Sequence, residues 1–263
     1  MAVSTLAAAF NDLQGDIGFF LGYGRGTPFG EAAWSLQQQN SITRCVKGGL
    51  RNFYHCGYDW SFLKPMAAVS LATGAQVAIL PDDFGGVEGR VVLAQITGST
   101  DWWPLEFGGL EPVYHHYGVF PTTTGRPRIC CIEPLKGTGS TMTQQWQLHV
   151  WPIADMAYTL KFQYYLNPDY IDGAFPYAYG GPEHAETQLE SCLAVAEKIL
   201  DDSATVHEME FQKRLDLSKM IDHRRKPQNV GYNGDRSDQK EQIWWDRAGW
   251  HALGPINVNG VFF

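Results

Sequence analysis

The stretch from Pro182 to Arg225 constrains the fold most, because it is the longest run with a clear helical period. Pro182 follows Gly181 and precedes acidic residues, as at the start of a helix. The apolar positions that then recur every three or four residues are Ala185, Leu189, Cys192, Leu193, Ala196, Ile199 and Leu200. The polar residues Glu190, Glu197 and Lys198 fall on the opposite side.

A second helix is predicted directly after this one. Asp201 to Ser203 interrupt the apolar pattern, and Thr205 with Glu208 forms a capping-box signature. The second helix should end before Pro227, since proline disfavours helical geometry in the residue that precedes it. We therefore expect an αα-hairpin, whose apolar stripes need a further partner from the rest of the chain.

Two more helices are predicted near the N-terminus. The first has helical spacing at Leu6, Phe10, Leu13, Ile17, Phe20 and Leu21. Ser35 and Gln38 resemble a capping box for the second, which should continue to Tyr54. Gly48 and Gly49 weaken this helix, and their position suits close approach of a neighbouring helix.

Between residues 62 and 166 the apolar pattern alternates, which predicts strands. The expected strands are Val69–Leu71, Val77–Ile79, Val87–Ile96, Val113–Phe120, Arg128–Ile132, Trp146–Val150 and Tyr158–Tyr164. We expect the first two to pair as a hairpin and the last two to form the final hairpin of an antiparallel sheet, with Trp146, Leu148 and Val150 facing the core.

The predicted fold class is α+β: an antiparallel helical bundle of two N-terminal and two C-terminal helices, an inserted antiparallel β domain and an extended C-terminal tail. The predicted domains are residues 1–60 with 180–226, residues 61–179, and residues 227–263. The first ten residues lack the features of a signal peptide and no apolar run is long enough to span a membrane, so we expect folding in a cytosol.

Composition points to protein contacts rather than to nucleic-acid affinity. Aromatic residues make up 13% of the chain, with nine Trp, while the net charge of −8 argues against a dedicated nucleic-acid binder. Large aromatic side chains gather at the C-terminal end, where glycine and proline discourage regular structure. We predict that this end binds the surface of another protein subunit through Trp244, Trp245, Trp250, Phe262 and Phe263.

No motif selects a catalytic, cofactor or metal site, and we predict none. The five cysteines contain no CxxC pair and should be reduced. His115 and His116 would point to opposite faces of a strand, and the adjacent Cys130 and Cys131 have no His selected by spacing. The glycines of residues 22–26 follow a helix, unlike a phosphate loop, and residues 233–238 lack EF-hand spacing.

With this order of helices, strands and helices, four stretches resemble head-to-tail adaptor (connector) proteins of tailed bacteriophages, in particular the tail tubular protein A-like group. These stretches are Phe53–Pro65, Leu80–Phe84, Ala157–Leu160 and Gly180–Glu186. The resemblance implies a non-enzymatic ring of identical subunits, usually twelve-fold, that joins the portal to the tail and forms part of the DNA channel. It implies a place in the virion neck after synthesis in the host cytoplasm. The implied partners are the portal, a tail or nozzle protein, neighbouring copies and transiently passing double-stranded DNA, with no membrane.

Two departures from that family leave other functions open. The simplest adaptors are almost wholly helical, and the Trp-rich end beyond Asp238 has no counterpart in the pattern. One alternative is a tail-associated hydrolase of a cell-surface polymer, with a groove lined by Trp102, Trp103, Asp82, Asp83 and Glu88. Another is a receptor-binding module, for which a trimer that binds surface glycans is expected.

Overall fold

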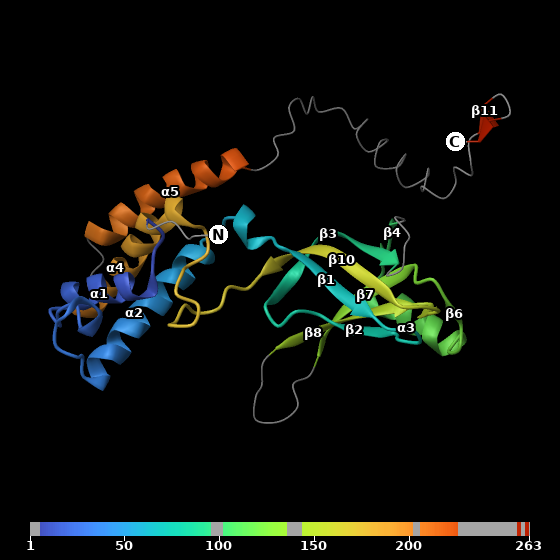
Figure 1. The fold of residues 1–263 in the computed structure, drawn as a ribbon, viewed down its shortest axis with the longest axis horizontal. Helices are drawn as coiled ribbons and strands as arrows, with labels where there is room; N and C mark the ends of the chain where they lie inside the picture. Colours follow the sequence, from blue (N-terminus) through green and yellow to red (C-terminus); the bar gives the residue numbers. More distant parts are fainter. Residues whose placement is uncertain are drawn as a thin grey trace. The chain divides into compact units, whose positions relative to one another are not determined.

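The computed structural model describes residues 6–95, 102–135, 144–201, 206–225, 257–258 and 261–262. The chain divides into two compact units, Met1–Arg225 and Lys226–Phe263. The first unit contains helices and mainly antiparallel sheets, so the fold class is α+β (Figure 1). In the second unit, Asn257–Val258 (β11) pairs antiparallel with Val261–Phe262 (β12).

Four long helices lie at the two ends of the first unit's sequence. They are α1 (Phe10–Phe20), α2 (Leu36–Tyr54), α4 (Ala185–Asp201) and α5 (Val206–Arg225), with 3-10 turns η1 (Thr27–Phe29), η2 (Ser61–Leu63) and η3 (Pro182–His184). These helices confirm the predicted ones, although α1 begins at Phe10 and leaves Leu6 exposed. Their inner side chains form one apolar cluster that includes Ile17, Phe53, Cys192 and Leu215, together with Trp60 from the segment after α2.

The start of α2 and its contact with α4 follow the predicted local chemistry. The Gln38 amide donates to Ser35 Oγ at 3.3 Å, and the Ser35 amide donates to Gln38 Oε1 at 2.8 Å, which completes the capping box. A Cβ atom at Gly49 would overlap the backbone of Cys192 on α4. Close approach of the two helices therefore explains the glycine inside α2.

The αα-hairpin of α4 and α5 is confirmed, but its buried face differs from the prediction. Ile199 and Leu200, expected on the buried face, are exposed in the last turn of α4. Glu197, expected on the polar side, is buried and accepts hydrogen bonds from the amides of Val206 and His207 at 3.1 and 3.2 Å. Its carboxylate thereby satisfies the start of α5. Thr205 lies outside the described residues.

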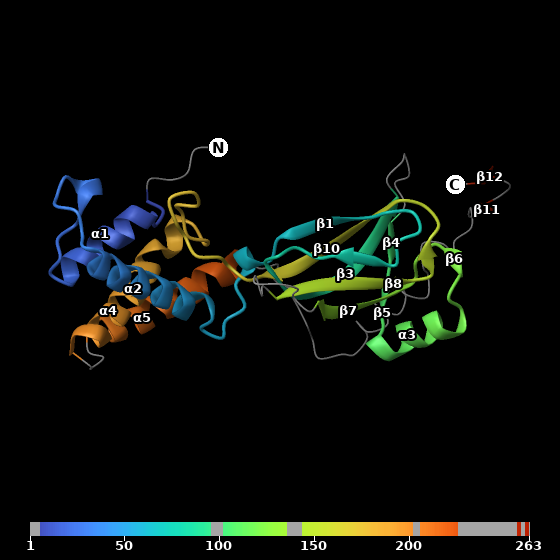
Figure 2. The ribbon, with the colours of Figure 1, turned by 90° about the horizontal axis from the view of Figure 1, so that it is seen from below.

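Two four-stranded sheets occupy the middle of the sequence (Figure 2). Their orders are β1-β10-β3-β4 and β2-β8-β7-β5. The strands are β1 (Met66–Leu71), β2 (Val77–Ile79), β3 (Phe84–Gln95), β4 (Trp102–Pro104), β5 (Glu106–Phe107), β7 (Ile129–Leu135), β8 (Gln145–Trp151) and β10 (Tyr158–Leu166). Two short strands, β6 (Thr124–Gly125) and β9 (Ile153–Ala154), pair in parallel, as do β5 and β7. Side chains from both sheets share one apolar cluster, so the sheets form two layers of one core.

Both predicted hairpins are wrong, although their strands exist. β1 pairs with β10 and β2 pairs with β8, so each predicted hairpin contributes one strand to each sheet. The two connections instead contact each other, because Gly74 N donates to Ala154 O at 2.7 Å and Ala154 N donates to Ala75 O at 3.2 Å. The alternation of apolar and polar residues identifies which face of a strand is buried, but not which strand it pairs with. Because the protein has two sheets, neighbouring strands in the sequence could pair within one sheet or belong to different sheets.

The predicted strand Val113–Phe120 is also wrong, because all of it except the capping residue Phe120 lies in helix α3 (Leu110–Val119). Gly109 precedes the helix and Pro112 occupies its first turn, where a missing amide costs nothing. The helix packs on β7 and β8 through the buried Val113. It therefore covers the second face of β8, which explains why His149 is buried between Leu148 and Val150 instead of facing solvent.

Candidate functional site

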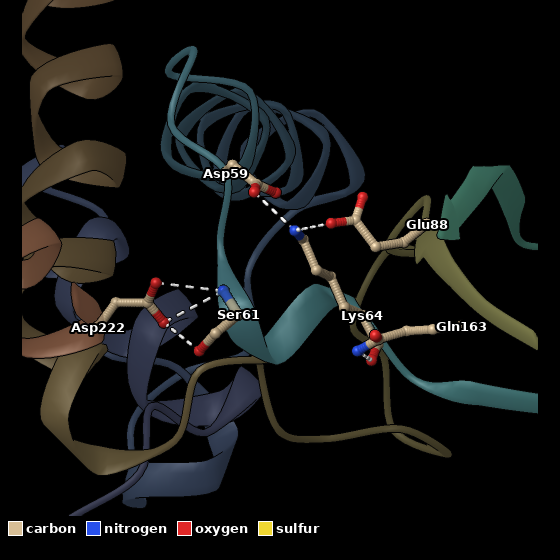
Figure 3. Close-up of polar contacts among 6 residues, drawn as sticks. All are labelled: Asp59, Ser61, Lys64, Glu88, Gln163 and Asp222. Carbon is tan, nitrogen blue, oxygen red and sulfur yellow. Dashed lines mark hydrogen bonds and ion pairs between the residues drawn. The ribbon is translucent and has the colours of Figure 1, made fainter. Parts of the chain in front are cut away.

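Lys64 joins the segment after α2 to strand β3 through two ion pairs. Its Nζ lies 2.6 Å from Asp59 Oδ2 and 2.9 Å from Glu88 Oε1 (Figure 3). The Tyr165 ring lies under the same ammonium at 4.8 Å. Burial alone would lower the pKa of Lys64, but the hydrogen bonds with Asp59 and Glu88 outweigh it and raise that pKa. Lys64 therefore stays charged, and it offsets one of the two negative charges of Asp59 and Glu88.

The same segment is tied to α5 and to β10. Asp222, fully buried on α5, accepts hydrogen bonds from the amide of Ser61 and from its hydroxyl, the latter at 2.5 Å (Figure 3). Gln163 Nε2 on β10 donates to the backbone oxygen of Lys64 at 2.9 Å. Residues 59–64 therefore form a short linker that is bonded both to helix α5 and to the sheet that contains β3 and β10.

Beside this linker runs a groove along the C-terminal half of α2. It consists of two neighbouring hollows of about 320 and 250 Å³, which share Tyr54, His55 and Pro168 as lining residues. Lys47 and Arg51 of α2 line one end. The other lining residues include Tyr58, Asp59, Trp60, Tyr165, Asp169 and Tyr170. The lining therefore combines aromatic rings with charged side chains of both signs.

Helix α5 presents a second candidate surface, which we name the α5 stripe. It consists of Val206, Met209, Leu217 and Met220, which are 59 to 64% exposed. Val206 and Leu217, like Met209 and Met220, are eleven residues apart, about three helical turns. The inner face of α5 buries Phe211, Leu215, Ser218 and Asp222. The helix is therefore apolar on two opposite faces, of which α4 covers one.

The structure places Cys131, one of the residues weighed in the sequence, in a partly buried polar cluster under α3. Cys131 lies opposite His149 in the pairing of β7 and β8, and His149 Nε2 contacts Glu133 Oε1 at 2.6 Å. Tyr114 of α3 donates to Glu133 Oε2 at 2.9 Å. Burial raises the pKa of the Cys131 thiol, so the thiol stays protonated. We interpret the cluster as a polar network that holds α3 on the sheet.

The carboxylates proposed for a hydrolase are engaged by separate partners. Asp82 accepts a hydrogen bond from Gln145 at 3.1 Å, Asp83 accepts one from Tyr164 at 3.0 Å, and Glu88 pairs with Lys64. The Trp103 ring instead stacks with the Arg126 guanidinium at 4.8 Å. His115 and His116 lie on α3, where His116 stacks on Trp151 at 4.3 Å. Among the described residues, no group of three or more His, Cys, Asp or Glu is placed to hold a metal ion.

The predicted partner-binding residues are mostly outside the described part of the chain. The residues outside the described ranges are Trp244, Trp245, Trp250 and Phe263. Phe262 belongs to β12 and lies opposite Asn257 of β11. Sequence reasoning missed the α5 stripe, although the eleven-residue repeat of apolar residues opposite Phe211 and Leu215 was readable. The groove carried no such signal, because it joins α2 to residues more than a hundred positions away.

No protein-family model matches the chain, and no curated protein is significantly similar to it. No helix in the described ranges combines the length and the apolar character needed to cross a bilayer.

Proposed function

We propose that the protein is a structural virion component, a head-to-tail adaptor that assembles as a homo-oligomeric ring between portal and tail. In this proposal α1, α2, α4 and α5 form the antiparallel bundle, the strands form its inserted β domain, and residues 227–263 form an extended arm. The observation that carries the proposal is the α5 stripe. A folded helix with a second apolar face is typical of a surface covered by another protein.

Charge on the α5 stripe favours a ring over a two-fold pair. Lys213 lies at the middle of the stripe, so two α5 helices crossing at their centres would bring like charges together. A contact with a different surface of the next copy avoids this repulsion. Such head-to-tail contacts close into rings when the rotation between copies permits.

The test of the proposal is assembly of the full chain with and without its portal. We expect rings in electron micrographs, and we expect Leu217→Glu combined with Met220→Glu to prevent them without lowering the melting temperature. The control is Gln212→Lys, which alters an exposed residue of α5 outside the stripe. A wild-type chain that stays monomeric beside its portal, or a double variant that assembles normally, would contradict the proposal.

The proposed arm has a separate test. Because Met1–Arg225 forms its own compact unit, truncation after Arg225 should leave a folded protein. If Trp244, Trp245, Trp250, Phe262 and Phe263 anchor the arm on a neighbour or on the portal, the truncated chain should fail to enter the connector. Normal incorporation of the truncated chain would exclude this role of the arm.

A further inference from the structure

The outer face of α2 is cationic in an otherwise acidic chain. Arg44, Lys47 and Arg51 are exposed and lie three and four residues apart, so they form one row, and His55 follows at the helix end. The helix contains no Asp or Glu, whereas the whole chain has a net charge of −8. The row is thus a local reversal of the protein's overall charge.

The charges of this row are not neutralised within the described residues. Other cationic side chains do form ion pairs there, among them Lys64 with Asp59 and Arg225 with Glu183. Arg44 and Arg51 make none, and Lys47 lies over the Tyr170 ring at 4.3 Å. Asp169 also lines the groove, but no ion pair joins it to Lys47 or Arg51 in the described part of the chain.

We infer that the outer face of α2 is the surface that contacts the phosphate backbone of double-stranded DNA. The inference rests on the proposed adaptor function and names the residues that face the passing genome. The row from Arg44 to Arg51 spans roughly 10 Å along the helix axis, so three cations can each meet a phosphate. Exposed Gln37, Asn40 and Asn52 supply further donors of the kind that contact phosphates without reading sequence.

Double-stranded DNA fits this row better than an acidic protein surface does. Protein interfaces interleave charges of both signs, whereas this row has one sign over its whole length and suits a ligand with one uniform charge. Three cations per subunit give weak binding, and the acidic remainder of the chain repels DNA. Contact is therefore confined to α2 and remains reversible, as transient passage requires.

Binding of the full chain to a random 30-base-pair duplex, followed by fluorescence anisotropy, tests the inference. Three phosphate contacts predict a slope of log affinity against log salt of roughly −2.7, or about a 40-fold loss of affinity between about 50 and 200 mM salt. Arg44→Gln combined with Arg51→Gln leaves one contact and reduces this loss to about 3.5-fold. The matched control is Arg25→Gln with Arg225→Gln, which removes two exposed arginines that lie outside α2 and outside the α5 stripe and should keep the wild-type slope.

Each outcome decides between the two proposals. An unchanged salt slope in the α2 double variant overturns the inference and leaves the adaptor function standing. Equal competition by polyglutamate would also overturn it, because the row would then serve an acidic protein. A chain that binds DNA through α2 but forms no ring with its portal supports the DNA contact and removes the adaptor function.

Discussion

Helices α2 and α5 lie on either side of α4 and face it in similar ways, yet their outer faces differ completely (Figure 1). Inward, α2 buries Phe53 and α5 buries Leu215 in the same apolar cluster. Outward, α5 exposes Leu217 and other apolar residues, whereas α2 exposes Arg44 and Arg51. Packing within the subunit accounts for the inner faces only, and the different chemistry of the outer faces is the basis of our two proposals, a protein contact at α5 and a DNA contact at α2.

The largest expected effect separates the two faces of α5. Leu215→Ala should lower the free energy of unfolding by about 2 to 5 kcal/mol, because it leaves a cavity in the shared cluster. Leu217→Ala, two residues later, should change it by less than about 0.5 kcal/mol, since that side chain is already exposed. Urea unfolding of both variants measures the difference. Equal losses would mean that the α5 stripe is covered within its own subunit.

A second change tests the inner face of α2. Gly49→Val places two methyl groups against the backbone of Cys192 and should cost about 1 to 3 kcal/mol. Gly48→Ala is the control, because its Cβ would meet only the Val195 side chain, and alanine gains up to about 1 kcal/mol of helix propensity. In thermal unfolding, the melting temperature of Gly49→Val should therefore be below that of the wild type, and that of Gly48→Ala should be equal to it or higher. Reversal of this order would show that α2 and α4 are not closely packed.

A third prediction concerns pH, at a residue near both helices. His184 is fully buried among Phe53, Trp60 and Phe62, and neither ring nitrogen has a hydrogen-bond partner. Burial lowers the pKa of His184, although Asp222 and Glu183 act in the opposite direction and Arg225 supports the shift.

The sign of the pH effect follows from this lowered pKa. The unfolded chain binds the proton more readily than the native protein, so stability is complete above about pH 6.5 and falls as the pH drops toward the native value. Urea unfolding between about pH 7 and 5 should show this loss in the wild type. His184→Phe should remove the part of this stability loss that comes from protonation of His184. A variant with the wild-type pH profile would place the titration elsewhere, for example at carboxylates such as Glu208, whose pKa is lowered chiefly by Lys198.

The helices were predictable from sequence and the partnership of the strands was not. Helix caps and glycines act on residues only a few positions away. The capping box of Ser35 and Gln38 and the interruption between α4 and α5 could therefore be recognised in the sequence. By contrast, β1 pairs with β10 across about ninety residues, and no local pattern encodes that choice. Residues 113–120 show the same limit, because aromatic residues suit a strand as well as a helix that lies on a sheet. The groove depends on such distant contacts and was equally hidden.

The smallest effect tests whether the row on α2 serves a ligand rather than the fold. Arg44 and Lys47 are like charges three residues apart on one helix, and such pairs destabilise a helix by about 0.2 to 0.5 kcal/mol. Arg44→Gln keeps a good helix former and removes one repulsion, so it should raise the free energy of unfolding by that amount at low salt. The gain should vanish near about 1 M salt, where charges at this distance are screened. Differential scanning calorimetry at both salt concentrations measures it. A loss of stability at low salt would mean that Arg44 makes a favourable contact in the folded protein, and a structural role would then account for it without DNA.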